Sequence, residues 1–279
     1  MAIKLLADSG STKCEWCVVD GKKKKTVITI GISPYFLKPG EIEQLLQKEL
    51  LPKIKNYEIA EVCYYGTGLA NPANVKIIKT VLRKVFPSAA IQVNHDLTAA
   101  ARAACGNEKG MVSILGTGSG ICYYNGKKIV KEHTGIGYVL GDEGSGAYLG
   151  KKVIQYYLYN TFDADLHARF NAKFMTTPME VLENVYKKPL PNRYLANFAV
   201  FLAENRGHYM IENIIEDGLN DFIINHVYKF RESWTHTLHF VGGIAYGFRD
   251  VLKELCNGYE LEVGKIIRHP MDGLIAYHQ

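Results

Sequence analysis

The sequence predicts an α/β protein built from two copies of one unit, and three observations carry this prediction. Its 279 residues exceed the usual size of one domain. Strand-like and helix-like stretches alternate along the chain. The segments Leu6 to Ser11 and Ile114 to Ser119 are each an apolar stretch entering a small-residue loop, and each leads to a second strand and a turn with Gly-Lys-Lys. The alternative is a coincidence between two generic hairpins.

In the first part of the chain, the hydrophobic pattern is typical of three strands, and then of helices and strands in alternation. Asp20-Gly21 is a hairpin signal between two of the strands, and Asn71-Pro72 is a helix N-cap followed by proline at the first helical position. The expected order is three strands, helix, strand, helix, strand, helix. The expected strands are 3–7, 15–19, 26–30, 62–65 and 91–93, and the expected helices begin at Pro39, Pro72 and Leu97.

A polar, turn-forming segment from Gly106 to Gly110 predicts the domain boundary. We expect an N-terminal domain over residues 1–107 and a C-terminal domain over residues 108–279. The second domain should carry a mainly helical insertion at about 143–232, followed by a strand at 238–241 and a helix from Ile244.

Composition excludes several classes of protein. The balance of 33 Lys+Arg against 28 Asp+Glu gives +5, too little for a nucleic-acid footprint, and the run Lys22 to Lys25 is expected to be a solvated hairpin tip. No apolar stretch is long enough for a membrane helix, and Asp8 interrupts any signal-peptide core. These features predict a cytoplasmic protein without a membrane partner. Its six cysteines, Cys14 and Cys17 included, fit reduced core residues.

Two small-residue loops are candidates for holding phosphates, because glycine lets the backbone approach an oxyanion and hydroxyls add donors. A third candidate follows a strand and opens a helix, where free N–H groups favour anions, although a plain strand-to-helix turn is the alternative. The candidate nucleotide-binding residues are Ser9, Gly10, Ser11, Thr12 and Lys13 in the first loop, Gly116, Gly118 and Ser119 in the second, and Gly242 and Gly243 in the third.

Three acids are candidates for chemistry. Asp8 adjoins the first loop and would repel phosphates unless a divalent cation, typically Mg²⁺, lies between them. Asp96 lies between a strand and a helix, where it could be an N-cap, a general base, or both. Asp142 lies in the glycine-rich segment Gly135 to Gly146 and could accept hydrogen bonds from a polyol, or Asp142 and Glu143 could merely favour the start of a helix.

These motifs together resemble those of the N-acetylglucosamine kinases, a family of the sugar kinase, heat-shock ATPase and actin superfamily. The resemblance extends from Asp8 to Ile275. It implies an α/β fold of duplicated ribonuclease-H-like (actin-like ATPase) domains with a nucleotide cleft between them, ATP and Mg²⁺ as cofactors, and an amino sugar as substrate. The residues that carry it are Asp8-Ser9-Gly10-Ser11-Thr12-Lys13, His95-Asp96, Leu115-Gly116-Thr117-Gly118-Ser119, Gly141-Asp142-Glu143-Gly144-Ser145 and Gly242-Gly243.

The resemblance also implies roles for single residues. Asp96 matches the base that activates the sugar 6-hydroxyl, and Asp8 matches the acid that holds Mg²⁺ through water. Two positions that line the family's sugar pocket differ: Ile136 stands where the family often has tryptophan, and no asparagine lies near Ser33. The preferred amino sugar therefore stays open. The positions that match sugar contacts are Thr117, Gly135 and Asp142.

Two other functions stay open at this point. The same superfamily includes ATPases that activate 2-hydroxyacyl-CoA dehydratases and hold an iron–sulfur cluster between two subunits, but Cys105 and Cys122 lack the matching context. A non-catalytic sensor of ATP or sugar is disfavoured because Asp8 and Asp96 are intact. The sequence leaves the oligomeric state undecided, a homodimer included.

Overall fold

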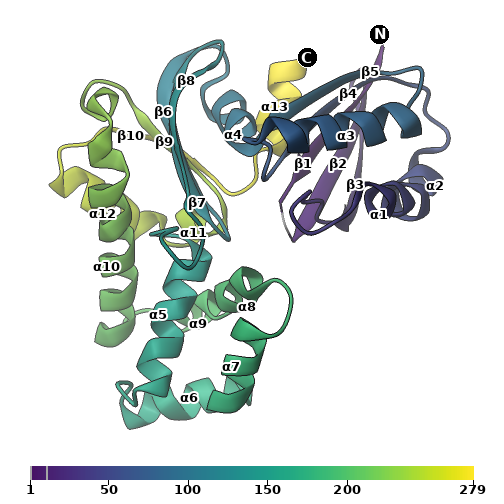
Figure 1. The fold of residues 1–279 in the computed structure, drawn as a ribbon. Coiled ribbons are helices and arrows are strands. Elements are labelled where there is room, and N and C mark those ends of the chain that lie inside the picture. Colours follow the sequence, from purple (N-terminus) through teal and green to yellow (C-terminus); the bar gives the residue numbers. More distant parts are fainter. Residues whose placement is uncertain (1, 11) are drawn as a thin grey trace. The chain divides into compact units, whose positions relative to one another are not determined.

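The computed structural model describes residues 2–10 and 12–279, and the chain forms two compact units. Unit 1 comprises Met1–Asn107 and Pro270–Gln279, and unit 2 comprises Glu108–His269. Each unit contains a five-stranded mixed sheet (Figure 1). The strands of unit 1 are β1 Ile3–Ser9, β2 Lys13–Asp20, β3 Lys23–Ile30, β4 Ile59–Gly66 and β5 Ala90–His95, and those of unit 2 are β6 Lys109–Leu115, β7 Ser119–Asn125, β8 Ile129–Thr134, β9 Leu238–Val241 and β10 Val263–Ile267.

The two sheets have the same topology. The order in unit 1 is β3-β2-β1-β4-β5, and in unit 2 it is β8-β7-β6-β9-β10. In both, the first three strands form an antiparallel meander, the fourth strand pairs in parallel with the first, and the fifth pairs in parallel with the fourth. The predicted α/β fold class with a duplicated unit is therefore confirmed, and each predicted small-residue loop joins the first and second strands of its sheet.

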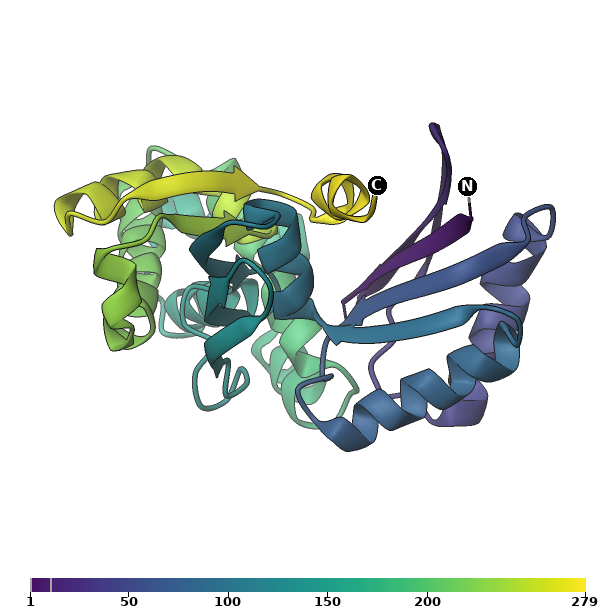
Figure 2. The same ribbon diagram turned by 90° about the horizontal axis from the view of Figure 1, so that it is seen from above.

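The helices of unit 1 cover both faces of its sheet (Figure 2). Alternate residues of β1 divide between the faces: Leu5 and Ala7 belong to the core beneath α1 and α3, whereas Leu6 is buried outside that cluster. Asn71 caps α3 as predicted, since its side chain accepts a hydrogen bond from Ala73 N at 2.9 Å. The helical elements are α1 Pro39–Leu45, a π-helical turn at Leu46–Leu50, α2 Leu51–Ile54, α3 Pro72–Val85, α4 Asp96–Cys105 and α13 Met271–His278.

Unit 2 carries a long helical segment between β8 and β9, where the sequence predicts an insertion. Phe162, Phe170, Phe198 and Phe201 form an aromatic cluster in its core. Figure 1 shows α6 and α7 at the end of α5 that is distant from the sheet. The helices are α5 Gly146–Leu158, α6 Ala164–Phe174, α7 Pro178–Tyr186, α8 Pro191–Asn197, α9 Ala199–Glu204, α10 Tyr209–Asn225, α11 Gly243–Gly247 and α12 Arg249–Gly258, with short 3₁₀ turns at Val227–Lys229 and Arg231–Trp234.

The strands of unit 1 are longer than predicted, and two differences from the predicted boundaries change the interpretation. The strand expected from Thr26 begins at Lys23, so the lysines after Lys22 lie in an exposed edge strand rather than at a hairpin tip. The second domain was expected to run to residue 279, but Pro270–Gln279 clusters with unit 1. The reason is that the apolar face of α13 needs a partner, and the alanine-rich helix α4 supplies one.

Polar contacts also hold α13 in unit 1. Tyr65 accepts a hydrogen bond from Arg102 Nη1 at 2.7 Å, and its hydroxyl lies 2.8 Å from His278 Nε2. Burial lowers the pKa of His278 to about 4, helped by the positive charges of Arg102 and Lys4. His278 is therefore neutral at pH 7, and its Nε2 accepts the proton of Tyr65.

No helix in residues 2–10 and 12–279 is long and apolar enough to cross a membrane.

The closest approach of α13 to α4 occurs at a glycine. A Cβ atom added to Gly273 would lie 2.5 Å from the carbonyl oxygen of Ala103 and 2.8 Å from its Cβ. We predict that Gly273→Ala lowers the free energy of unfolding by about 1–3 kcal/mol, because overpacking against backbone outweighs the better helix propensity of alanine. Gly258→Ala, at the end of α12 with nothing near its Cβ position, is the matched control and should leave stability unchanged or slightly higher. Denaturant unfolding of both variants checks this, and equal stabilities would contradict the packing argument.

Candidate active site

The carboxyl ends of the parallel strands in unit 1 bring two predicted acids together. Ser9 at the end of β1 pairs with Gly66 at the end of β4, which pairs with His95 at the end of β5. Asp8 precedes the first of these residues and Asp96 follows the last. Because the ends are in register, the two carboxyl groups lie near enough for the charge of Asp96 to act on Asp8.

The Asp8 carboxyl lies in a partly buried place near two other negatively charged side chains. Its pKa is raised to about 7, first by burial and then by the charges of Asp96 and Glu15, while Lys13 opposes the shift. Lys13 is itself shared, since its Nζ lies 4.0 Å from a Glu15 carboxylate oxygen. A half-buried carboxylate with uncompensated charge and hard oxygen donors fits a divalent cation such as Mg²⁺. Asp8 is thus the residue that would hold the metal in this unit.

Asp96 is the first residue of α4, and the N-cap is its neighbour His95. The Nδ1 atom of His95 accepts from Leu97 N at 3.0 Å, and Asp96 Oδ1 accepts from the same N–H at 2.9 Å. The Asp96 side chain keeps 33% of its surface exposed. The sequence left the N-cap and general-base roles of Asp96 open; the structure gives the cap to His95 and leaves the Asp96 carboxylate available to a ligand. Sequence reasoning missed this capping role of His95, although its place directly before the helix was a usable signal.

The first phosphate loop is anchored by hydrogen bonds of its own. Gly10 N donates to Lys13 O at 3.0 Å, and the carbonyl of Thr12 accepts from Gly31 N. Ser9 is buried, and its Oγ accepts from Ile32 N at 3.1 Å. Its side chain therefore fastens the loop, and any contact of Ser9 with phosphate would come from its backbone. Ser11 lies outside the described residues, so its predicted role has no structural test.

The segment after β3 lies at the same edge of the sheet. Ser33 is buried, and its carbonyl accepts from Phe36 N and Leu37 N at 3.0 Å. Tyr35 was not singled out from the sequence, yet its side chain is 63% exposed and its ring would lie 2.9 Å from a Cβ atom on Gly68. At this place the structure presents the aromatic ring of Tyr35 outward and turns Ser33 inward.

In unit 2, the second loop and the third candidate loop lie against each other. Gly116 N donates to Gly118 O at 3.0 Å and closes the turn between β6 and β7. A Cβ atom on Gly242, whose φ is 130°, would overlap the carbonyl of Leu115 and lie 3.2 Å from Gly116 N. Only glycine fits this position, since both the backbone angle and the space exclude a side chain. The Cβ position of Gly243 is open.

The first turn of α5 docks on the same loop. Gly146 N donates to Gly116 O at 2.8 Å, and Ala147 N donates to Thr117 O at 3.1 Å. The glycine-rich segment is therefore tied to the second phosphate loop by its C-terminal end.

Asp142 gathers several of the predicted residues of unit 2 around its carboxylate. A Cβ atom on Gly135 would overlap Asp142 Oδ1, and one on Gly118 would lie 3.0 Å from Asp142 Oδ2. Gly137 N donates to Asp142 Oδ1 at 3.2 Å, and Gly135 N donates to Ser119 O at 3.0 Å. Burial raises the pKa of Asp142, and the amide of Gly137 opposes the shift. The buried Ser119 Oγ finds no hydrogen-bond partner in the described part of the chain.

Ile136 is an exposed residue of the glycine-rich segment. Its side chain is 59% exposed, and its Cγ1 atom would lie 2.6 Å from a Cβ atom on Gly141. Val139 and Leu140 nearby are also exposed. The exposed side chains of this segment thus include three apolar ones, whereas Asp142 is buried.

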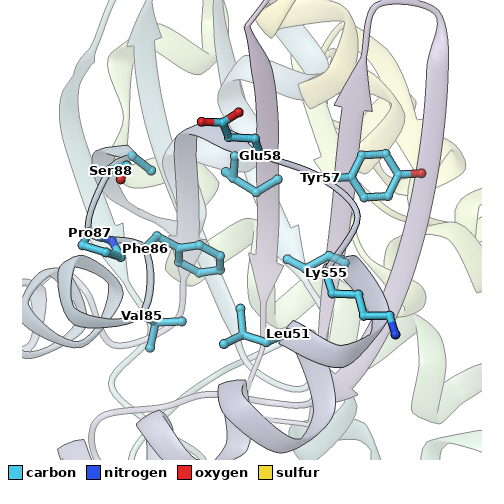
Figure 3. A pocket seen from close by; sticks show the side chains of 11 residues that line it. Leu51, Lys55, Tyr57, Glu58, Val85, Phe86, Pro87 and Ser88 are labelled. Carbon is cyan, nitrogen blue, oxygen red and sulfur yellow. The ribbon is translucent and has the colours of Figure 1, made fainter.

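A cavity of about 380 Å³ in unit 1 lies apart from these residues. It opens beside the amino end of β4, between α2 and α3, and Figure 3 shows Leu51, Val85 and Phe86 lining it with Tyr57. Because Asp8 and Asp96 lie at the carboxyl ends of β1 and β5, this apolar cavity is at the opposite edge of the sheet and holds none of the predicted site residues.

Comparison with known proteins assigns the family. The sequence profile of the BadF/BadG/BcrA/BcrD ATPase family matches residues 7–275. The chain belongs to this ATPase family. The matched range includes Asp8, Asp96, Asp142 and the three glycine loops.

Several solved structures and one characterised sequence are similar to this ATPase. A candidate N-acetylglucosamine kinase from Porphyromonas gingivalis is 35% identical, covers 100% of this chain and 98% of its own, and has a TM-score of 0.94. A candidate N-acetylglucosamine kinase from Chromobacterium violaceum, at 17% identity, covers 100% and 99% with a TM-score of 0.73. A Streptomyces griseus ROK-family glucokinase in complex with glucose and AMPPNP, at 14% identity, covers 99% and 98% with a TM-score of 0.55. The last two likenesses show the fold alone.

The characterised sequence is an N-acetylmuramic acid/N-acetylglucosamine kinase from Clostridium acetobutylicum. It is 29% identical to this ATPase over 121 residues, which are 41% of this chain and 39% of that kinase. The match therefore spans well under half of the length of that relative.

The raised pKa of Asp8 predicts a stability effect. Its folded pKa of about 7 lies above the ordinary value of 3.8, so the ionised folded form is disfavoured and stability falls as pH rises from about 4 to 7. Without Mg²⁺, Asp8→Asn should be more stable than the wild type at pH 8, by about 1–3 kcal/mol after allowing for partial solvent screening, and equal to it near pH 4. Unfolding at both pH values measures this. Added Mg²⁺ should stabilise only the wild type, and a variant that is less stable at pH 8 would contradict the charge argument.

Proposed function

We propose that the protein is a sugar kinase that transfers the γ-phosphoryl group of ATP to the 6-hydroxyl of N-acetylglucosamine or a related amino sugar. The observation that carries the proposal is the pair of carboxyl groups at one edge of the unit 1 sheet. Asp8 has the uncompensated charge that suits a cation, and Asp96 is exposed enough to meet a substrate hydroxyl. The names of the Porphyromonas and Clostridium relatives support the choice of substrate.

Asp96 is the proposed general base. It accepts the proton of the sugar hydroxyl as the oxygen forms its bond to the γ-phosphorus and the bond to the ADP oxygen breaks. The hydrogen bond from Leu97 N to Asp96 Oδ1 sets the direction of the carboxylate. Phosphoryl transfer needs little covalent help, so positioning of the two reacting oxygens is the main contribution of this residue.

The proposed ATP contacts come from the three candidate phosphate loops. Mg²⁺, held at Asp8 through water, would neutralise phosphate charge when bound. Gly10 N and Gly116 N are used within their own turns, so other backbone N–H groups of these loops would donate to phosphate oxygens, and the unpartnered Ser119 Oγ offers a further donor. The residues proposed to contact ATP are Ser9, Gly10, Ser11, Thr12, Lys13, Gly116, Gly118, Ser119, Gly242 and Gly243.

The proposed sugar contacts centre on Asp142. Its carboxylate, backed by Gly118 and Gly135, can accept hydrogen bonds from two sugar hydroxyls. Thr117 adjoins this cluster, and Ile136 is proposed to face the sugar with its exposed side chain. Ser33 is also in the proposed set, but its burial limits it to a backbone contact or a supporting role.

The activator alternative is weaker in the structure. A cluster shared between subunits needs thiolates at the surface, whereas all six cysteines are buried and reduced. Burial raises the pKa of Cys63 and of Cys256 to about 12, so these thiols are not ready metal ligands at pH 7. A cytoplasmic location and a homodimer stay predictions.

A coupled ADP-release assay tests the proposal directly. Purified protein with ATP and Mg²⁺ should release ADP with N-acetylglucosamine, and the rate should fall when the 6-hydroxyl is replaced by hydrogen. Glucosamine, N-acetylmannosamine, N-acetylmuramate and glucose complete the panel. ADP release no faster than background with every sugar would refute the kinase activity. The non-catalytic sensor of ATP or sugar would then be the remaining function.

Asp96→Asn tests the base. The amide keeps the size of the side chain but cannot take a proton, so turnover should fall at least about 10²-fold while ATP binding persists. Asp272→Asn is the matched control, because Asp272 is an exposed acid in the first turn of α13 in the same unit. Calorimetry with ATP and steady-state kinetics measure both effects. Turnover in Asp96→Asn equal to that of Asp272→Asn would remove Asp96 from the mechanism.

A further inference from the structure

Next to Asp142 in the sequence, Glu143 begins a series of short polar contacts that connects three side chains of unit 2. Glu143 Oε2 lies 2.8 Å from His226 Nε2, and His226 Nδ1 lies 3.0 Å from His133 Nδ1. The three residues come from separate places: the glycine-rich segment, the end of α10, and strand β8. His226 lies 83 residues from Glu143 and 93 residues from His133 along the chain, so no local sequence pattern connects it with either of them.

His226, which lies between Glu143 and His133 in this series of contacts, is buried. His226 is only 2% exposed, and its ring stacks on Phe222 with ring centres 5.0 Å apart. A Cβ atom on Gly144 would lie 2.7 Å from Phe222 Cβ, so the glycine-rich segment lies directly on α10 at this point. The partner of Glu143 is therefore a fixed one, unlike a flexible surface side chain.

The direction of the hydrogen bonds follows from the donors. An ionised Glu143 has only acceptors, so His226 must donate its Nε2–H to it. When the His226 ring is neutral, its Nδ1 carries a lone pair, and His133 must donate its own Nδ1–H to that atom. Burial and the neighbouring His226 lower the pKa of His133, which keeps the outer ring neutral. Each ring thus fixes the tautomer of the next.

The backbone at this place needs an anchor. Asp142 has a φ of 58° and Gly144 a φ of 70°, so Glu143 lies between two residues in the left-handed region. For a residue with a side chain this conformation costs about 1–2 kcal/mol, and it persists only where the surroundings enforce it. Ser145 N donates to Asp142 O at 3.1 Å from one side, and the Glu143–His226 contact holds the other.

We propose that Glu143 and His226 are positioning residues for Asp142, with His133 fixing the tautomer of His226. These contacts would hold the strained backbone so that the Asp142 carboxylate meets the sugar at a set angle. This inference rests on the proposed function, because it assigns sugar binding to Asp142. Loss of the Glu143–His226–His133 contacts should therefore weaken sugar binding more than phosphoryl transfer or ATP binding.

The decisive comparison is between two histidines of unit 2. His226→Ala breaks this series of contacts, and His208→Ala breaks a carboxylate–imidazole pair of the same 2.8 Å length, with Asp163, in the helical insertion. We expect the sugar KM to rise at least about tenfold in His226→Ala with little change in ATP KM, because ground-state positioning is lost. In His208→Ala we expect a lower melting temperature and a sugar KM within about twofold of the wild type.

Glu143→Gln adds a readout that a purely structural role would not move. The amide oxygen still accepts from His226 Nε2, so the sugar KM should rise less than in Glu143→Ala. Glu143 raises the pKa of Asp142 and His226 lowers it, while Lys229 acts on His133 beyond them. Removing the Glu143 charge should therefore shift the acidic limb of the kcat/KM profile for the sugar to lower pH. An unchanged profile with equal KM values in both Glu143 variants would overturn the proposal.

Nuclear magnetic resonance separates this proposal from the proposed function. Histidine ¹⁵N shifts should show a protonated Nε2 in His226 and a protonated Nδ1 in His133, and the Asp142 amide signal should move in His226→Ala but not in His208→Ala. If the wild type phosphorylates no sugar, the proposed function fails and these signals alone decide the positioning role. If the wild type is active and His226→Ala keeps the sugar KM of His208→Ala, the positioning role is refuted while the kinase stands.

Discussion

The burial of the Asp8 carboxyl beside a second carboxyl group is the constraint on which the proposed chemistry depends. Parallel pairing of β1, β4 and β5 brings Asp8 and Asp96 to one edge, and burial with uncompensated charge raises the pKa of Asp8 to about 7. A fold selected for stability alone would place a neutral residue there. A cation would relieve this unfavourable charge, so the feature that lowers stability without a cation is also the one that would favour the proposed binding of Mg²⁺ with ATP.

In unit 2, close contacts between backbone segments at glycines shape the candidate site. Gly242 lies against the carbonyl of Leu115, and Gly135 lies against Asp142, so that two loops and one carboxylate share a space that side chains would fill. These contacts explain why small residues gather at these positions. They also leave Asp142 in a left-handed conformation, which is held by its own neighbours and by the buried pair Glu143 and His226.

Much of the fold could be predicted from local patterns. The strand at Leu238–Val241, the cap at Asn71 and the repeated loops are each visible in a few consecutive residues, and all three agree with the structure. The end of the chain could not be assigned in this way. The helix Met271–His278 was predicted to belong to the second domain, but its partner is α4, and nothing within the helix itself specifies that partner.

The sequence by itself determined the duplicated α/β architecture and supplied the candidate residues for phosphate, cation and sugar, because period, turn chemistry and side-chain type are local properties. Only the tertiary structure decided which of these residues act on one another. It turned the Ser9 and Ser33 side chains inward, and it joined Glu143 to His226 and His226 to His133. Hydrogen bonds and charge interactions depend on distances between residues far apart in the chain, and those distances exist only once strands and helices have packed.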